Sequence, residues 1–294
     1  MVGSPAWRTG VEFLKEKHDY SERRACQLLE VARSGLQYKP REKSDERQLR
    51  ERIRSLSRRH KRFGYRRIGA LVRQESGVNI KRVHRIWKSE GLSLPRRRPR
   101  RKSHTGSKNE QRVPVKPNEV WSYDFVEDRT EKGGRLRMLC VIDEYTRECL
   151  TIRVEKSIGS GEVIETLEWL FMTRGVPEHI RSDNGPEFIA KQLKNWLEKQ
   201  GCKTLYIEPG SPWQNAYIES FNGKFRDECL NREVFKNGTH AREVVVGWTQ
   251  EYNEERPHSA LGYVTPVEFA RVALNTLRPT ASACSTRKER QVQG

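Results

Sequence analysis

Cysteine is scarce in this chain and is never arranged in the pairs that metal sites or disulfide frameworks use. The 294 residues include six cysteines, none of which forms a Cys-x-x-Cys pair or a His/Cys cluster with zinc spacing. The lack of a disulfide framework indicates a reducing compartment. No run of 18 apolar residues occurs, and no signal-peptide core opens the chain. The sequence therefore predicts a cytoplasmic protein without a membrane partner.

Negative charge is deficient in the first third of the chain. Residues 1–110 contain 31 Lys and Arg against 12 Asp and Glu, whereas residues 111–294 contain 26 against 27. A basic block of this size favours nucleic-acid phosphates through counterion release. A solvated, solubilising face is the alternative. Apolar residues recur at helical spacing through the same stretch, which favours a folded DNA-binding region.

Apolar periodicity predicts an all-α region over residues 1–94. A helix pair is expected over 10–35, in which Ser21 caps the second helix and Gly35 closes it. The apolar stripe of that helix would run through Ala25, Leu28 and Leu29. A further helix is expected over 45–60.

A helix-turn-helix is predicted at about 64–91, because two short periodic stretches are separated by Gly77 and the potential cap Asn79. The second helix has one apolar and one cationic face, as a groove-docking helix requires. Its candidate DNA contacts are Lys81, Arg82, Arg85 and Lys88. An ordinary surface helix in a small bundle is the alternative.

Residues 95–114 form a predicted basic linker, because prolines interrupt a run of mutually repelling charges. We expect this linker to follow DNA phosphates. Its candidate contacts are Arg96, Arg97, Arg98, Arg100 and Arg101. A nuclear-localisation-like address is the alternative.

Residues 115–275 alternate apolar runs with helical periodicity, which predicts an α/β fold with a mixed sheet flanked by helices. Strands are expected over 119–126, 137–143 and 149–154, up to Asp183, and over 203–207. Helices are expected over 160–173, over 186–200, through Glu219 and within 240–272. The polar tail over 276–294 is predicted to be disordered.

Three acidic residues lie in segments whose folding does not require an acidic side chain. Asp124 interrupts an apolar run, Asp183 ends a short strand, and Glu219 follows after 35 intervening residues. A carboxylate within a strand is costly to desolvate unless a cation neutralises it. If the three converge, they would form an oxygen-rich Mg²⁺ site.

Helical spacing places Glu219 on a polar face, away from the core stripe. The other members of that face are Asn215, Asn222 and Arg226. Asn215 and Arg226 are candidate DNA contacts, and an ordinary surface charge is the alternative for Arg226. Among the remaining acids, Asp143 is interpreted as a turn former. Glu187 is interpreted as a first-turn helix acid, with a spare metal ligand as the alternative.

Three longer motifs, at residues 182–188, 211–223 and 252–261, accompany these acids. Together they resemble the second reading-frame protein, OrfB, of the bacterial insertion-sequence-three family, with its DDE integrase catalytic core. The resemblance covers roughly residues 10–272. It implies a ribonuclease-H-like catalytic core, and Arg226 matches the family's Lys/Arg position. The chain departs from retroviral integrases in lacking their amino-terminal His-His-Cys-Cys site.

The resemblance implies a transposase that cleaves DNA and transfers strands at insertion-sequence ends, with DNA recombination and integration as the outcome. It implies two Mg²⁺ ions (Mn²⁺ as an alternative), with Asp124 bridging both and Asp183 and Glu219 holding one each. Implied partners are terminal repeats and target DNA, an OrfA-type protein or fusion, and further protomers in a homo-oligomer on DNA. The implied location is the bacterial cytoplasm, with nucleoid association. A ribonuclease-H-like nuclease that cuts without joining and a non-catalytic DNA-binding regulator are the rival functions.

Overall fold

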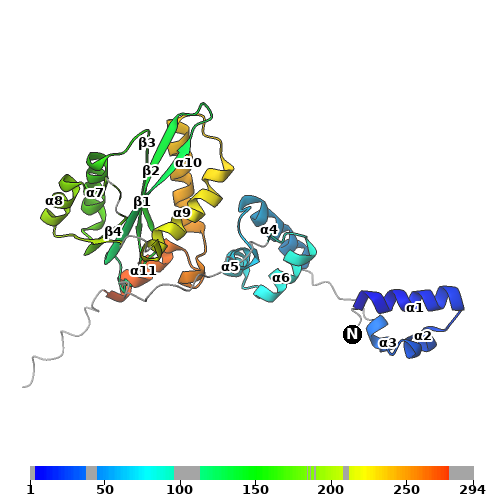
Figure 1. Cartoon of the computed structure of the whole chain (residues 1–294). Helices are drawn as coiled ribbons and strands as arrows, with labels where there is room; N and C mark the ends of the chain where they lie inside the picture. The colour runs from blue at the N-terminus through cyan, green and yellow to red at the C-terminus, as the bar shows by residue number, and fades with distance from the viewer. Residues whose placement is uncertain are drawn as a thin grey trace, which may run out of the picture. The chain divides into compact units, whose positions relative to one another are not determined.

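The chain forms two compact units, Met1–Arg52 and Ile53–Gly294, shown in the computed structural model of Figure 1. The structure describes residues 4–37, 45–95, 113–183, 185, 187–188, 190–207 and 212–277. The five arginines predicted to follow DNA in the linker lie outside the described residues, as does nearly all of the predicted tail.

The first unit contains three short helices, α1 (Ser4–His18), α2 (Glu22–Leu28) and α3 (Arg33–Gln37). The predicted cap is confirmed, because the Ser21 hydroxyl accepts a hydrogen bond from the Arg24 amide. The predicted helix end at Gly35 is wrong. The chain leaves the helix after Leu28, with Glu30 in the left-handed region, and Gly35 lies inside α3.

The predicted apolar stripe of α2 is also wrong. Ala25 and Cys26 are its buried residues and pack with Val11 of α1, whereas Leu28 and Leu29 are exposed. The helix ends at Leu28, so the face expected from a longer helix does not continue.

The predicted helix-turn-helix is present in the second unit. It consists of α5 (Tyr65–Ser76) and α6 (Ile80–Ser89), and α4 (Glu46–Arg59), which precedes it, contains the boundary between the two units. Gly77 ends α5 with a left-handed φ of 65°, which glycine adopts without steric cost. The Asn79 side chain begins α6 by accepting a hydrogen bond from the Lys81 amide at 2.9 Å. Ile68 of α5 and Trp87 of α6 are among the buried residues of the pair.

A mixed five-stranded sheet lies at the centre of the second unit, in the order β3-β2-β1-β4-β5. The strands are β1 (Val120–Arg129), β2 (Arg135–Asp143), β3 (Cys149–Glu155), β4 (His179–Ser182) and β5 (Lys203–Tyr206). β1, β2 and β3 pair antiparallel, whereas β4 is parallel to both β1 and β5. All five strands agree with the sequence prediction, as does the mixed character of the sheet.

Helices cover both faces of this sheet (Figure 1). α7 (Ser160–Arg174) and α8 (Lys191–Lys199) share one core with the sheet. α9 (Ala216–Glu228) and α10 (Gly238–Gln250) share the other core with the opposite face. Short helices precede, separate and follow α9 and α10 in the chain: η1 (Pro212–Asn215), η2 (Leu230–Arg232), η3 (Glu251–Glu255) and η4 (Ser259–Leu261). The last helix, α11, spans Pro266–Leu277.

The helix predicted over 186–200 begins later than expected, at Lys191. Phe188 is 1% exposed and packs on Phe125, with ring centroids 4.8 Å apart, which holds the preceding segment against the sheet. The interpretation of Glu187 as a helix acid is therefore wrong. Its carboxylate pairs instead with Arg137 at 2.7 Å.

Asp143 forms the turn after β2, as predicted. Its Oδ1 accepts hydrogen bonds from the amides of Tyr145 and Thr146, both at 2.8 Å. The cysteines of the described ranges, Cys26, Cys140, Cys149, Cys202 and Cys229, are all free thiols and all buried. Among the described residues, no helix is both long and apolar enough to cross a membrane.

Candidate active site

Asp124 lies in the middle of β1, on the sheet face that α9 covers. Side chains alternate along a strand, so Tyr123 and Phe125 point to the α7–α8 side while Val126 joins the α9–α10 core. Asp124 shares the α9 side with Val126 and is half-buried. β1 therefore presents one carboxylate to the helix that carries Glu219.

Asp183 follows directly after β4, the parallel neighbour of β1. The register pairs Ser122 with Arg181, so two residues further on Asp183 lies level with Asp124. Adjacent strands are about 4.8 Å apart, which brings the two acids close. The Asp183 side chain is exposed, and its Oδ1 accepts a hydrogen bond from the Gly185 amide at 3.0 Å.

Glu219 lies in the first turn of α9 and is exposed. Asn222, three residues later, donates a hydrogen bond from Nδ2 to Oδ2 of Asp124 at 2.8 Å. This contact fixes the polar side of α9 against the middle of β1. The apolar residues Ile218, Phe221 and Phe225 bury the other side of the helix.

The three acids share one electrostatic environment. Burial raises the pKa of Asp124 to about 6, and the negative charges of Asp183 and Glu219 also raise it. Hydrogen bonds from the Phe125 amide and from Asn222 act in the opposite direction. Asp183 and Glu219 are thus close enough to affect the ionisation of Asp124, although Glu219 lies 95 positions away from it in the chain.

The three acids have no cationic partner in the described part of the chain. None of them forms an ion pair with a lysine or arginine there, and Asp124 accepts hydrogen bonds from amide groups instead. Over the same ranges, no group of three His, Cys, Asp or Glu side chains is already gathered as metal ligands. Repelling carboxylates are expected to stand apart without a cation, and their all-oxygen donor set is the type that hard divalent ions prefer. The residues therefore fit a divalent metal chemically.

A buried network beneath the acids was not identified from the sequence. Arg181 donates from Nε to Oε1 of Glu144 at 2.9 Å and from Nη1 to the backbone oxygen of Gln214 at 3.2 Å. The Ser122 hydroxyl donates to the same Glu144 oxygen. The network joins β1, which carries Asp124, to β4, which precedes Asp183, and to η1, which precedes the helix of Glu219. Burial raises the pKa of Glu144, and the positive charge of Arg181 lowers it.

The candidate DNA contacts differ in accessibility. Arg226 is exposed, and its Nη2 donates to the backbone oxygen of Glu127 at 3.4 Å. Asn215 is only 3% exposed, and its Oδ1 has no hydrogen-bond partner in the described part of the chain. The expected polar face of α9 is thus accessible at Glu219 and Arg226 but closed at Asn215. On α6, Lys81, Arg85 and Lys88 are exposed and Arg82 is half-buried.

Comparison with known protein families identifies matching regions in both parts of the chain. Models described as an integrase core domain match residues 114–212 and 200–266. A model described as an HTH-like domain matches residues 43–100.

Several curated proteins are similar over most of their length. A 31.7 kDa protein of insertion element IS407 from Burkholderia multivorans is 44% identical over 258 residues, which are 87% of this chain and 93% of that protein. A 39.2 kDa protein of insertion element IS476 from Xanthomonas euvesicatoria is 39% identical, over 90% of this chain and 76% of that protein. The transposase InsD of insertion element IS2 from Escherichia coli is 29% identical, over 71% and 73% respectively.

Among solved structures, the HTLV-2 integrase catalytic core domain aligns with a TM-score of 0.41 and 17% identity, over 53% of this chain and 98% of that chain. The BIV integrase catalytic core domain aligns with a TM-score of 0.43 and 18% identity, over 54% and 97%.

Proposed function

The chain belongs to the insertion-sequence-three family of transposases, and we propose that Asp124, Asp183 and Glu219 form the catalytic centre of its DDE integrase core. Transposition and DNA integration are the functions of this family. The observation that carries our assignment of residues is geometric: the strand register sets Asp183 level with Asp124, and the Asn222–Asp124 hydrogen bond holds the helix of Glu219 against β1. The reaction we assign is cleavage at the element ends followed by strand transfer into target DNA.

Family membership implies dependence on a divalent metal. We propose that the metal is Mg²⁺, with Mn²⁺ as an alternative, and that two ions bind, with Asp124 shared and Asp183 and Glu219 holding one each. Such ions stabilise the attacking and leaving oxygens of a phosphodiester when they are bound. The protein's contribution is to hold its carboxylates in place: Asn222 orients Asp124, and Arg181 links β4 to the segment before α9.

DNA binding is divided between two regions in this proposal. The exposed cations of α6, with Lys81, Arg85 and Lys88 foremost and Arg82 beside them, fit the major groove. Arg226 lies on the same side of α9 as Glu219 and fits a phosphate near the reacting bond. Contacts by Asn215 and by the linker arginines stay predictions.

Further partners and boundaries are proposals as well. We infer that several protomers assemble on two element ends, and that an OrfA-type protein acts with this chain or is fused to it. The division into a helical region (1–94), a linker (95–114), a core (115–275) and a tail (276–294) stays a prediction. So does location on the nucleoid in the bacterial cytoplasm.

The decisive experiment is a strand-joining assay with labelled element ends and plasmid in Mg²⁺. Glu219→Gln removes one charge from the site, and we expect joining to fall below detection while affinity for end DNA stays near wild type. Glu243→Gln, the same change at an exposed residue of α10, is the matched control and should join normally. Retained joining in Glu219→Gln would falsify the metal assignment.

The same assay separates the rival functions. A nuclease would release cut ends without joining them, and a regulator would bind without cutting. Joined products that depend on Glu219 support only the transposase.

A further inference from the structure

A cavity lined by several cations lies on the side of α9 that faces away from Glu219. Its volume is about 340 Å³, within the size range of small-ligand pockets. Tyr217, Ser220 and Lys224 line it from α9. At 3.6 residues per turn these positions lie about 100–160° around the helix from Glu219. The cavity is therefore separate from the site of the three acids.

Positive charge predominates around this cavity. Its cationic lining residues are Arg67, Arg147, Lys224 and Arg256. Glu228 neutralises one of them, because it pairs with Arg256 through Nε at 2.7 Å and Nη2 at 2.5 Å. The same carboxylate lies 3.6 Å from Arg67. His258 adds no charge, because burial lowers the pKa of its imidazole to about 2.

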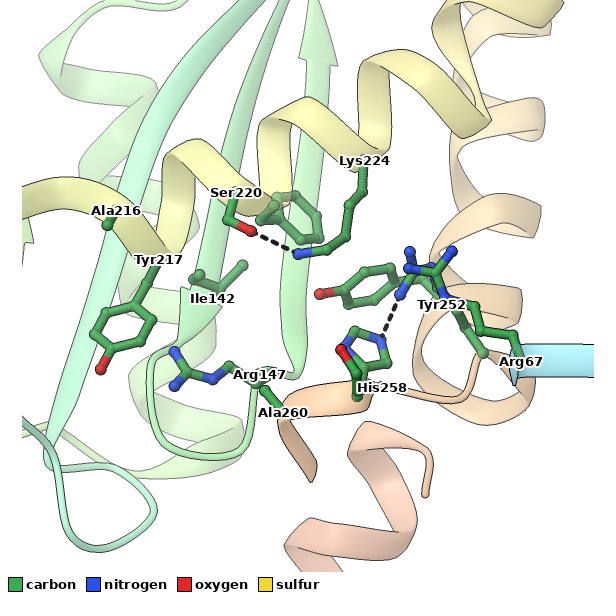
Figure 2. Close-up of a pocket in the computed structure, with 13 residues that line it drawn as sticks. Arg67, Ile142, Arg147, Ala216, Tyr217, Ser220, Lys224, Tyr252, His258 and Ala260 are labelled. Atoms are coloured by element: carbon green, nitrogen blue, oxygen red, sulfur yellow. Dashed lines mark hydrogen bonds between the residues drawn. The ribbon is translucent and has the colours of Figure 1, made fainter. Parts of the chain in front are cut away.

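Lys224 and Arg147 are not neutralised by any carboxylate contact in the described ranges. The Lys224 amine donates only to the Ser220 hydroxyl, at 2.8 Å, in the described part of the chain. The Arg147 guanidinium lies over the Tyr217 ring at 3.8 Å, and its Nη1 is buried with no described hydrogen-bond partner. Figure 2 shows Arg147, Lys224 and His258 around a common space, reached from the β2–β3 turn, from α9 and from the segment after α10.

Desolvation of a cation without a counter-charge is costly. Arg147 and Lys224 are both half-buried, and Nη1 of Arg147 is a buried atom without a described partner. Because both side chains line one cavity, we infer that an anion completes the site. A phosphate group offers several acceptor oxygens and forms strong, charge-assisted hydrogen bonds with guanidinium and ammonium groups. The aromatic and hydroxyl groups of the lining also suit the sugar to which such a phosphate is attached.

We propose that this cavity binds a phosphate group through Lys224 and Arg147. We propose further that the group belongs to the backbone of a DNA strand that crosses α9 on the side facing away from Glu219. A free phosphate has the same chemistry and is the alternative source. The assignment to DNA rests on the proposed function, whereas phosphate binding itself does not.

The first arm of the test measures phosphate binding by the full-length protein. Inorganic phosphate is titrated at constant ionic strength while the melting temperature is followed. Phosphate also stabilises proteins unspecifically, so variants decide the outcome. We expect the rise in Tm to be smaller in Lys224→Gln and in Arg147→Gln than in Lys194→Gln, a matched change at an exposed residue of α8. Circular dichroism checks that each variant folds. If Lys224→Gln in α9 misfolds, Arg147→Gln, which changes a turn residue, still tests the proposal.

The second arm measures the salt dependence of binding to element-end DNA. Loss of one phosphate contact lowers the slope of log K against log salt by about 0.9 for duplex DNA and about 0.7 for a single strand. We expect this decrease in Lys224→Gln and no change in Lys194→Gln. If phosphate raises the Tm selectively but the slope stays constant, the site binds free phosphate and the assignment to DNA is wrong. If neither measurement distinguishes the variants, the cavity is not a phosphate site. Failure of the Glu219→Gln experiment alone leaves the phosphate arm unaffected.

Discussion

Removal of the Arg181 guanidinium should destabilise the protein by an amount that depends on pH. Arg181→Met keeps much of the side-chain volume. It leaves Glu144, which is fully buried, with only the Ser122 hydroxyl as a hydrogen-bond donor in the described part of the chain. Breaking a buried ion pair by removing one member costs about 3–5 kcal/mol. Glu144 can reduce this cost by taking up a proton. With an ordinary pKa of 4.5, protonation at pH 7 costs about 3.4 kcal/mol, because each pH unit is worth about 1.36 kcal/mol.

The sign of the pH dependence follows from the same carboxyl. In the variant, the folded-state pKa of Glu144 is raised above its unfolded value, so a protonated Glu144 is favoured in the folded protein. Stability from such a group is present at low pH and is lost as pH rises through the folded-state pKa. The deficit of Arg181→Met should therefore be about 3 kcal/mol at pH 7. At pH 5 the cost of protonation falls to about 0.7 kcal/mol, and the deficit should shrink accordingly.

Urea unfolding at pH 7 and pH 5, followed by tryptophan fluorescence, measures both values, since Trp121 is fully buried in the same sheet. The double variant Arg181→Met/Glu144→Gln carries no unpaired charge and should recover most of the loss at pH 7. A deficit that is equal at the two pH values, or a double variant no more stable than the single one, would refute the reasoning.

Two further outcomes are expected. Arg85→Ala should weaken binding to element-end DNA by about 1–3 kcal/mol, because Arg85 is an exposed cation of α6. A titration at physiological salt measures this change, and unchanged affinity would count against a DNA contact by the helix-turn-helix. Burial, with the charges of Arg256, Arg67 and Arg147, lowers the pKa of Lys224 to about 8, whereas Glu228 raises it. A bound phosphate should raise this pKa, so phosphate binding at pH 8 should take up protons in wild type and fewer protons in Lys224→Gln. Calorimetry in two buffers of different ionisation enthalpy measures this uptake. Equal uptake by the two proteins would exclude a contact between phosphate and Lys224.

Local patterns were sufficient to predict the sheet, whereas the joint role of the three acids stays a prediction. Strands such as β2, which buries Leu139 and Val141 on one face and Met138 and Cys140 on the other, contain an uninterrupted apolar run and are easy to identify. The spacing of Asp183 and Glu219, together with the longer motifs, identified the family and hence its fold. Nothing in these patterns required knowledge of distant contacts.

Features that depend on distant contacts were missed. The start of α8 was misplaced because Phe188 packs on Phe125, a contact between segments far apart in the chain. The pairing of Arg181 with Glu144 bridges 37 positions, and neither residue has a local spacing that identifies its partner. The burial of Asn215 depends on the packing around η1, so helical periodicity alone placed it on an open face.

The burial of the cysteines has a practical consequence for following the protein at work. Burial raises the pKa of the Cys140, Cys149, Cys202 and Cys229 thiols, and only thiolates react readily with maleimide dyes. Cys26 is buried as well, which limits its contact with a dye. A single cysteine engineered on the surface of α6 or α10 should therefore accept a fluorophore selectively once Cys284, outside the described residues, is replaced. Energy transfer between two such dyes would then report when DNA ends are brought together, without rebuilding the interior of the protein.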